Sequence, residues 1–267
     1  MSNDVVIAIL ARNKDYSLPF FLNCIYNLDF DKKRLHLYIK TNDNTDNTVD
    51  ILKTFIEKYK DEYKSVYYDD TSINNELCKY DEHQWDCLRF KILGNIRQQS
   101  IDYAINLGCH YFVIDCDNFI TKNTLTDLFQ DKDKGIIAPL LITNRLYANY
   151  HYDTTNHGYF KDHPTYIDIL NRTISGLIRV NVVHCTYFID NQYLKHVSYD
   201  DDSYRYEYVI FSDTMRKLNI PQYINNIKFY GFLVLCNKNE YLANIEHFKS
   251  DLIIDNNNNY NIMFNNL

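Results

Sequence analysis

The chain has 267 residues and a formal net charge of −7 at pH 7. This length allows one large domain with a buried core, and the negative charge argues against nucleic acid as the main partner. No apolar run approaches the ~18 residues of a membrane span, and the N-terminus lacks the basic and apolar regions of a signal peptide. Because the seven cysteines form no Cys-x-x-Cys pair, we expect reduced thiols and a cytoplasmic protein. The sequence leaves the oligomeric state open, a homo-oligomer included.

The first half of the chain alternates between strand and helix patterns. The apolar run from Val5 to Leu10 predicts a strand buried on both faces, and Ser17 with Pro19 predicts the start of a helix that continues to Leu28. The elements expected next are a strand over 35–39, a helix over 48–62, a strand over 65–68, a helix over 86–107 and a strand over 111–114. This alternation predicts a Rossmann-like α/β fold, with a mostly parallel central sheet flanked by helices.

The second half of the chain is less regular. Its patterns predict strands over 135–139 and 228–235, one or two strands over 176–189, and a helix over 207–218. An Asn-rich, low-complexity segment follows at 255–259. We therefore expect one domain over residues 1–250 and a loosely docked tail over residues 251–267.

The strand over 111–114 leads directly into Asp115-Cys116-Asp117-Asn118. The two carboxylates are one residue apart, so in an extended chain they point the same way, and hard cations such as Mn²⁺ or Mg²⁺ prefer such oxygen ligands. Asp-x-Asp also occurs in charged, loop-like surroundings, at Asp29/Asp31, Asp131/Asp133 and Asp200/Asp202. Only the pair at 115 and 117 leaves an apolar strand, where α/β folds place their ligands. We therefore expect a metal ion there, bound against the diphosphate of a nucleotide sugar.

Polar loops after the first two strands are candidates for the nucleoside. Arg12, Asn13 and Asp43 could contact uracil and ribose, with ordinary loop capping as the alternative for each of them. Arg97, on the long helix before the Asp-x-Asp strand, could reach a phosphate or a sugar hydroxyl, or lie in solvent. The residues expected to contact the donor are Leu10, Ala11, Arg12, Asn13, Asp43, Arg97, Asp115 and Cys116.

Two further roles need side chains from the second half. His247, beyond the last predicted strand, is the candidate third metal ligand beside Asp115 and Asp117, although a structural histidine is the alternative. An inverting transfer needs a carboxylate as general base, and Glu207 at the start of a helix has the right chemistry. A helix-capping charge is the alternative for Glu207, and Asp202 in the preceding loop is the second candidate base.

Several segments together resemble the procollagen galactosyltransferases and their relatives. The segments, in chain order, are Ile9–Asn13 with Ser17–Pro19, Asp46–Thr48, His83-Gln84, Asp115–Asn118, Ala138–Leu141, Tyr147 with Asn149-Tyr150, Gly158-Tyr159, and Arg179–Thr186. The resemblance covers most of residues 5–235. It implies a GT-A glycosyltransferase fold, a UDP-sugar donor, Mn²⁺, and inverting transfer of galactose to hydroxylysine of a collagen-like protein. The acceptor is expected to pass Tyr147, Asn149, Tyr150 and His184.

One departure from the family keeps other functions open. Where the family tends to have two adjacent acids before the late helix, this chain has Glu207-Tyr208. The alternatives are a transferase-like module that binds a UDP-sugar or glycan without turnover, and a glucosyltransferase of the same fold. A nucleotidylyltransferase is disfavoured, because no glycine-rich basic loop follows the first strand. These residues do not decide between galactose and glucose as the donor hexose, or between a collagen-like and another protein as the acceptor.

Overall fold

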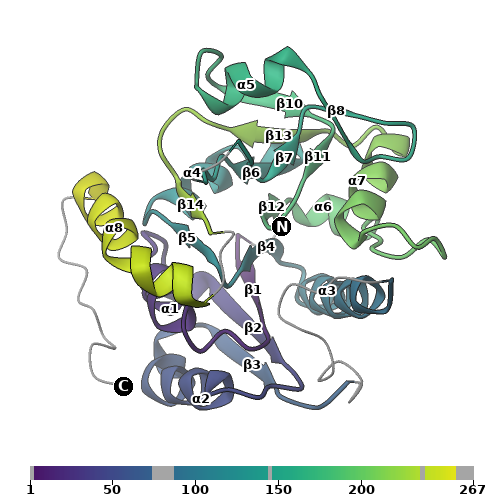
Figure 1. The fold of residues 1–267 in the computed structure, drawn as a ribbon. Coiled ribbons are helices and arrows are strands. Elements are labelled where there is room, and N and C mark those ends of the chain that lie inside the picture. The colour runs from purple at the N-terminus through teal and green to yellow at the C-terminus, as the bar shows by residue number, and fades with distance from the viewer. Residues whose placement is uncertain (1–2, 74–86, 144–145, 235–237, 257–267) are drawn as a thin grey trace.

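The computed structural model describes residues 3–73, 87–143, 146–234 and 238–256. His83-Gln84 and residues 257–259, on which two of the sequence expectations rest, lie outside these ranges. The core of the molecule is an eight-stranded sheet with the order β10-β13-β6-β12-β4-β1-β2-β3 (Figure 1). Its strands are β1 Val5–Ala11, β2 Leu35–Thr41, β3 Ser65–Asp69, β4 His110–Asp115, β6 Ile136–Pro139, β10 Leu177–Val180, β12 Thr186–Ile189 and β13 Gln222–Asn225.

Most of the sheet is parallel. Strand β1 pairs in parallel with β2 and β4, β2 with β3, and β6 with β13, whereas β12 is antiparallel to both of its neighbours and β10 is antiparallel to β13. The predicted α/β fold with a mostly parallel sheet is therefore confirmed. The alternation along β1 explains its burial on both faces, since Val5, Ile7 and Ile9 pack into one core cluster and Val6 and Ala8 into another.

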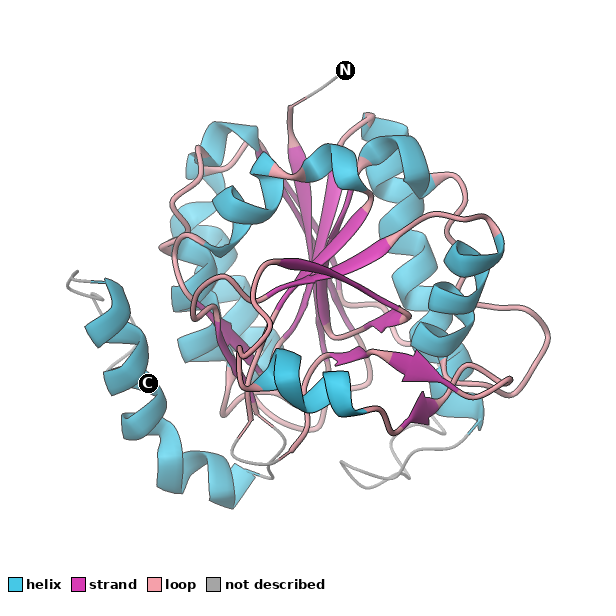
Figure 2. Cartoon of the chain, turned by 90° about the horizontal axis from the view of Figure 1, so that it is seen from above, coloured by secondary structure: helices cyan, strands magenta, loops and turns pink. Residues whose placement is uncertain are grey.

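Helices cover both faces of the sheet (Figure 2). Residues of α1 Leu18–Tyr26, α2 Thr48–Tyr59 and α4 Thr124–Gln130 contribute to the cluster that holds Ile7. Residues of α3 Cys87–Leu107, α5 Pro164–Leu170, α6 Asn191–Leu194 and α7 Glu207–Lys217 contribute to the cluster that holds Val6. Within the described residues, no helix combines the length and the apolar character needed to cross a membrane.

Within the described ranges, three pairs of short strands and three single turns of 3₁₀ helix lie outside the main sheet and the α-helices. The strand pairs are β11 Val182–Val183 with β7 Tyr150–His151, β14 Gly231–Leu233 with β5 Asn118–Ile120, and β8 Asp153–Thr154 with β9 Phe160–Lys161. The 3₁₀ turns are Lys32–Arg34, Lys60–Glu62 and Lys132–Lys134. Each of these elements has only two or three residues, too few to show the periodic hydrophobic pattern by which a strand or helix is predicted.

Four of the differences between the structure and the sequence expectations concern larger elements after residue 117. Segment 176–189 forms three strands, and β13, which completes the main sheet beside β6, was not expected. The strand expected over 228–235 is only β14, which pairs with β5 outside the main sheet. A final helix, α8 Lys238–Asn256, runs through the expected domain boundary at residue 250. Tyr241 and Leu252 of α8 are buried in the cluster that holds Ile7.

Candidate active site

A cavity of about 430 Å³ opens at the carboxyl ends of β1, β2 and β4. Residues at the end of each strand line it, and α3 and the start of α7 close the opposite side. The strands end together because their pairing places Leu10 beside both Lys40 and Asp115. A volume of this size is within the range of pockets that hold a small organic ligand. The cavity lies at the carboxyl edge of the parallel strands, where the sequence predicts the site.

The loop after β1 is fixed by the loop after β2. The backbone amides of Asn13, Lys14 and Asp15 donate hydrogen bonds to Asn44 Oδ1 at 2.8 Å, Thr48 Oγ1 at 2.7 Å and Asp46 Oδ2 at 3.0 Å. This is why a run of polar residues lies between β2 and α2: their side chains satisfy the amides of the neighbouring loop. The loop that carries Arg12 and Lys14 is thereby held beside the cavity.

Two residues that were expected to contact the donor, Asn13 and Asp43, form hydrogen bonds within the loops. Asn13 and Asp43 both adopt positive φ angles, 52° and 47°, and neither lines the cavity. Asn13 Oδ1 accepts a hydrogen bond from the amide of Thr45, and Asp43 Oδ2 accepts one from the amide of Ile73 at 3.2 Å. The structure therefore gives both residues the loop-capping role that was the alternative. Leu10, Ala11, Arg12, Arg97, Asp115 and Cys116 do line the cavity.

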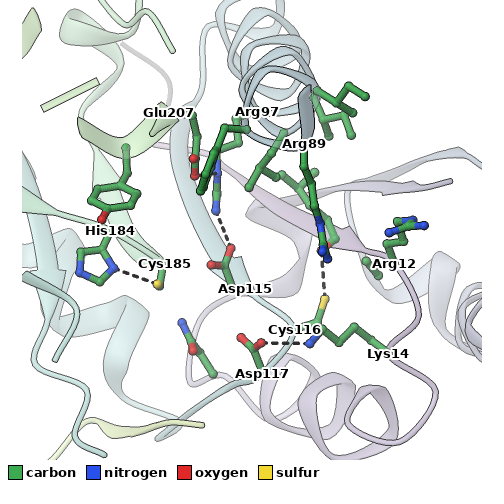
Figure 3. Close-up of a pocket in the computed structure, with 18 of the residues that line it drawn as sticks. Arg12, Lys14, Arg89, Arg97, Asp115, Cys116, Asp117, His184, Cys185 and Glu207 are labelled. Atoms are coloured by element: carbon green, nitrogen blue, oxygen red, sulfur yellow. Dashed lines mark hydrogen bonds and ion pairs between the residues drawn. The ribbon is translucent and has the colours of Figure 1, made fainter. Parts of the chain in front are cut away.

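Each carboxylate of the Asp-x-Asp pair lies against a cation. Asp115 Oδ1 is 2.8 Å from Arg97 Nη2, and Asp117 Oδ2 is 3.1 Å from Lys14 Nζ (Figure 3). Burial raises the pKa of Asp115, and Arg97 opposes that rise. Burial alone would lower the pKa of Lys14, but the Asp117 carboxylate and the Tyr16 hydroxyl raise it above its ordinary value. Lys14 is therefore charged at neutral pH.

The oxygen atoms at this edge fit a hard divalent cation. Asp115, Asp117 and Asn118 all line the cavity, and each offers side-chain oxygen, the ligand that Mg²⁺ and Mn²⁺ prefer. Asn118 donates through Nδ2 to Thr186 Oγ1 at 2.8 Å, whereas its buried Oδ1 has no hydrogen-bond partner within the described residues. An amide oxygen of this kind is a possible third ligand, one that the sequence reasoning did not name.

Arg97 joins Asp115 to the expected general base. Its side chain is 4% exposed, and its Nε lies 3.5 Å from Oε1 of Glu207, the first residue of α7. Burial raises the pKa of Glu207, and Arg97 partly opposes the rise. Glu207 Oε2 is buried without a hydrogen-bond partner in the described part of the chain. The structure therefore places Glu207 on the lining of the cavity, and its expected role as general base stays a prediction.

Gly94 lets α3 come close enough for this contact. A Cβ at Gly94 would lie 3.0 Å from the carbonyl oxygen of Tyr199 and 3.4 Å from Cβ of Glu207. A side chain at this position would therefore require the Tyr199 carbonyl to shift by a few tenths of an ångström. Arg97 lies less than one turn further along α3, on the segment that makes this close approach.

The far side of the cavity is aromatic and carries a neutral histidine. Tyr147, His184 and Tyr208 line it, and the ring centroids of His184 and Tyr208 are 4.9 Å apart. Burial, with the nearby His151 and Arg97, holds the pKa of His184 well below its usual range. In Figure 3, His184 and Lys14 lie on opposite sides of Asp115 and Asp117.

Two residues expected to contact the acceptor are structural instead. Asn149 is buried, donating to Pro139 O and accepting from the Leu141 amide, each within 2.9 Å. Tyr150 is also buried, and its hydroxyl donates to Tyr166 O at 2.6 Å. The expectation that Asn149 and Tyr150 border the acceptor is therefore wrong, because Asn149 holds the end of β6 and the residues after it, and Tyr150 holds α5.

Asp202 and His247 lie away from the other expected site residues. Asp202 is exposed in the loop before α7, with a φ of 60°, and its amide donates to Asp200 Oδ1. His247 is exposed on α8, with its ring centroid 6.3 Å from that of Phe232. Neither residue lines the cavity. Their expected roles as base and metal ligand stay predictions that this arrangement does not support.

The sequence reasoning also missed several cationic residues of the cavity. Lys14, Lys40 and Arg89 line it together with Arg12 and Arg97. The signal for Lys14 was available, since it follows the first strand by three residues, in the loop already singled out for Arg12. Lys40 was hidden because it lies within β2, where its ammonium is buried and pairs with Asp69 at 2.8 Å.

A second group with metal-binding chemistry lies at the other end of the same strands. Asp4, His36 and Cys109 bring one ligand atom each within 4.8 Å of one another. Asp4 and Cys109 directly precede β1 and β4, so this group is separated from Asp115 by the length of β4. Asp4 pairs with Lys64, and His36 Nδ1 is 2.7 Å from Ser65 Oγ. Protein partners thus already occupy two of the three ligands.

Comparisons with known proteins identify the family of this chain. Residues 2–249 match the model of the glycosyltransferase family 25 N-terminal domain. The chain is 28% identical to procollagen galactosyltransferase 2 of Mus musculus over 94% of its length, and 28% identical to the inactive glycosyltransferase 25 family member 3 of Mus musculus over 86%. It spans 42% and 40% of those two relatives.

Solved structures show the same fold at low sequence identity. Residues 1–349 of S. aureus TarS in complex with UDP superpose with a TM-score of 0.56 at 15% identity, covering 96% of this chain and 67% of that one. The mannosyltransferase PcManGT from Pyrobaculum calidifontis, in complex with GDP-Man and Mn²⁺, gives a TM-score of 0.53 at 10% identity, with coverages of 94% and 63%. The expected GT-A architecture is thereby confirmed. With the family model matching almost the whole chain, this protein belongs to glycosyltransferase family 25, as a member with the N-terminal domain of that family.

Proposed function

We propose that this protein binds a UDP-hexose in the cavity and transfers the hexose, galactose in our expectation, to a protein acceptor with inversion. The observation that carries the proposal is the convergence of Asp115, Asp117 and Glu207 on one cavity at the carboxyl ends of β1, β2 and β4. Similarity to procollagen galactosyltransferases supports the choice of galactose and of hydroxylysine in a collagen-like chain as the acceptor.

The lining suits a nucleotide diphosphate. Five cationic side chains and three carboxylates face the cavity, which is an excess of two positive charges. Lys40 is one of the five, and its charge is balanced by Asp69 outside the cavity. The net positive field favours an anionic ligand. Arg12, Lys40 and Asn42 at the ends of β1 and β2 would then surround the nucleoside. Asp115 and Asp117, with Asn118, would hold Mn²⁺ or Mg²⁺, which neutralises charge on the leaving diphosphate.

The transfer step assigns a role to Glu207. Its carboxylate takes the proton of the acceptor hydroxyl as the hydroxyl oxygen bonds to the anomeric carbon. The bond from that carbon to the diphosphate breaks, and UDP leaves with the bonding electrons. Arg97 holds Glu207 and Asp115 on the same side of the cavity, and Tyr147 and His184 leave an aromatic wall on which a sugar or peptide acceptor can pack.

A binding module without turnover is the second candidate. Tyr208 stands beside Glu207, where the resemblance leads one to expect a second acid, and inactive members occur among the relatives at the same identity. Burial raises the pKa of Tyr208 to a value above its ordinary range, with Glu207 contributing to the rise. A neutral phenol cannot accept the acceptor proton. Under this alternative the cavity binds UDP-sugar, and no acceptor stimulates its breakdown.

The test is UDP release from a panel of UDP-sugars, with and without Mn²⁺ and with a hydroxylysine-containing collagen peptide. We expect peptide-stimulated release from one sugar, and a loss of about a hundredfold or more in the Asp117→Asn variant. The control is Asp133→Asn, which changes an exposed Asp-x-Asp pair on the surface. Full activity of Asp117→Asn would refute the proposed site. UDP binding without release from any donor would establish the binding module instead.

A further inference from the structure

We infer that Lys14 is the resident cation of the diphosphate site: it competes with the divalent ion for Asp117 and, once displaced, pairs with the diphosphate of the nucleotide. This inference rests on the proposed function and names a donor-binding residue that neither the sequence reasoning nor the comparisons assign. Its basis is the position of the Lys14 ammonium, 3.1 Å from Asp117 Oδ2 and on the lining of the cavity.

The backbone of Lys14 is fixed, so only its side chain can move. Its amide donates to Thr48 Oγ1 at 2.7 Å, and its carbonyl accepts from the amides of Ser17 and Leu18 at 3.1 and 2.9 Å. These bonds tie it to the first residue of α2 and to the start of α1. Rotation about the four side-chain bonds can still carry the ammonium from Asp117 to a neighbouring oxygen, because lysine is a long and flexible point charge.

Polar neighbours hold the charged ammonium at the lining of the cavity. Apart from Asp117, Lys14 Nζ contacts the hydroxyl of Tyr16 at 3.2 Å, and lies 5.5 Å from the centroid of that ring. The Lys14 side chain is 18% exposed and that of Asp117 is 33% exposed. A ligand that enters the cavity can therefore contact the Lys14 ammonium and the Asp117 carboxylate where they lie. Each group can then replace its contact with the other by a contact with the ligand.

A divalent ion and this ammonium favour the same carboxylate. Two cations at one carboxylate repel each other, so a bound metal ion raises the free energy of Lys14 in its present position. The phosphate oxygens of an entering diphosphate offer the displaced ammonium a charge-assisted hydrogen bond. Lys14 thus opposes metal binding before the nucleotide arrives and supports nucleotide binding afterwards.

The two effects have opposite signs, which distinguishes this role from a structural one. In Lys14→Met, which keeps the apolar stem, we expect Mn²⁺ to bind about tenfold more tightly in the absence of nucleotide, because the competing charge is gone. We expect UDP without metal to bind about tenfold or more weakly, because a charge-assisted contact is lost. Lys14→Arg keeps the charge, and should retain UDP binding within about threefold of the wild type.

The measurements are isothermal titration calorimetry with UDP, and Mn²⁺ titration followed by electron paramagnetic resonance of the free ion. Lys238→Met is the matched control, since Lys238 pairs with Asp15 in the same loop at 2.9 Å but does not line the cavity. Far-UV circular dichroism of each variant checks that it is folded. Lys14→Gln, which also removes the charge, carries the test if Lys14→Met does not fold.

The outcomes separate this inference from the proposed function. Tighter Mn²⁺ binding with weaker UDP binding in Lys14→Met supports it. Unchanged affinities, or parallel loss of both, would overturn it while leaving UDP binding by the wild type intact. A wild-type protein that binds neither UDP nor Mn²⁺ would overturn the inference and the proposed function together.

Discussion

His151 should make the stability of this protein fall in acid, and the structure allows the size of the effect to be worked out. The residue lies in β7, with its ring 5.4 Å from that of Phe160 and 5.5 Å from that of His184. Its Nδ1 is buried and has no hydrogen-bond partner within the described residues. Burial, and then the charge of Arg216, lower the pKa of His151 from 6.5 to about 4.

The sign follows from proton binding. Between pH 6.5 and 4 the unfolded chain binds a proton at this histidine and the folded chain does not, so the free energy of unfolding falls as the pH falls through this window. With the two pKa values above, the loss from this one residue is about 2 kcal/mol between pH 7.5 and pH 5, and approaches about 3 kcal/mol below pH 4. At pH 7.5 the imidazole is neutral in both states, so its titration contributes almost nothing.

The perturbation is His151→Leu, measured by urea unfolding of both proteins at pH 7.5, 6.5, 5.5 and 5. We expect the difference in unfolding free energy between wild type and variant to shift by about 2 kcal/mol in favour of the variant across this series. His196→Gln, at an exposed position, controls for the removal of any histidine. A difference that stays constant with pH would show that His151 takes up its proton in the folded state, and would refute the reasoning.

Two glycine substitutions test the close approaches in the fold. A Cβ at Gly231, where φ is +136°, would lie 1.9 Å from Phe119 O, so Gly231→Ala should lose at least about 3 kcal/mol of unfolding free energy. The control is Gly176→Ala, because Gly176 has a φ of +142° and open space around it. An equal loss in both variants would show that the contact with Phe119 O is unimportant. Gly94→Ala should not show the increase of about 1 kcal/mol in unfolding free energy that replacing glycine by alanine normally brings in a helix interior, since its Cβ would lie 3.0 Å from Tyr199 O. The comparison is Asn95→Ala, on the exposed side of α3. A Gly94 variant stabilised as much as the Asn95 variant would contradict the packing argument. Thermal unfolding measures this second pair.

Sequence patterns were sufficient for the parallel half of the sheet. Val5–Leu10 and Tyr111–Ile114 are continuous apolar runs, and a strand that is covered by helices on both faces has no polar side to show. Their polar ends then fix where the site lies, which is why Arg12, Asp115 and Asp117 could be placed before the structure. The turn residues between them, such as Asn13 at a φ of 52°, carry a composition signal as well.

The second half could not be predicted in the same way. Strand β13 has four residues, Gln222–Asn225, and it belongs to the main sheet because each of them pairs with a residue of β6 that lies 86 positions earlier in the chain. Strand β12 is antiparallel to both neighbours, a direction set by its connections and not by its own sequence. Lys14, likewise, is an ordinary loop lysine in the sequence. It becomes a site residue only because α2 fixes the loop that carries it.

The residues proposed to bind the nucleotide and the residue proposed to assist transfer come from different elements of the fold. The groups expected to hold the donor come from β1, β2 and β4, whose ends are fixed by parallel pairing, whereas Glu207 comes from α7 and reaches the carboxylate pair through Arg97. A change at the start of α7 could therefore alter the proposed general base and leave the donor side of the cavity intact. Glu207 is buried with its carboxylate 3.5 Å from Arg97 Nε, so the proposed transfer step has a carboxylate on the lining of the cavity, and we expect turnover to depend on it.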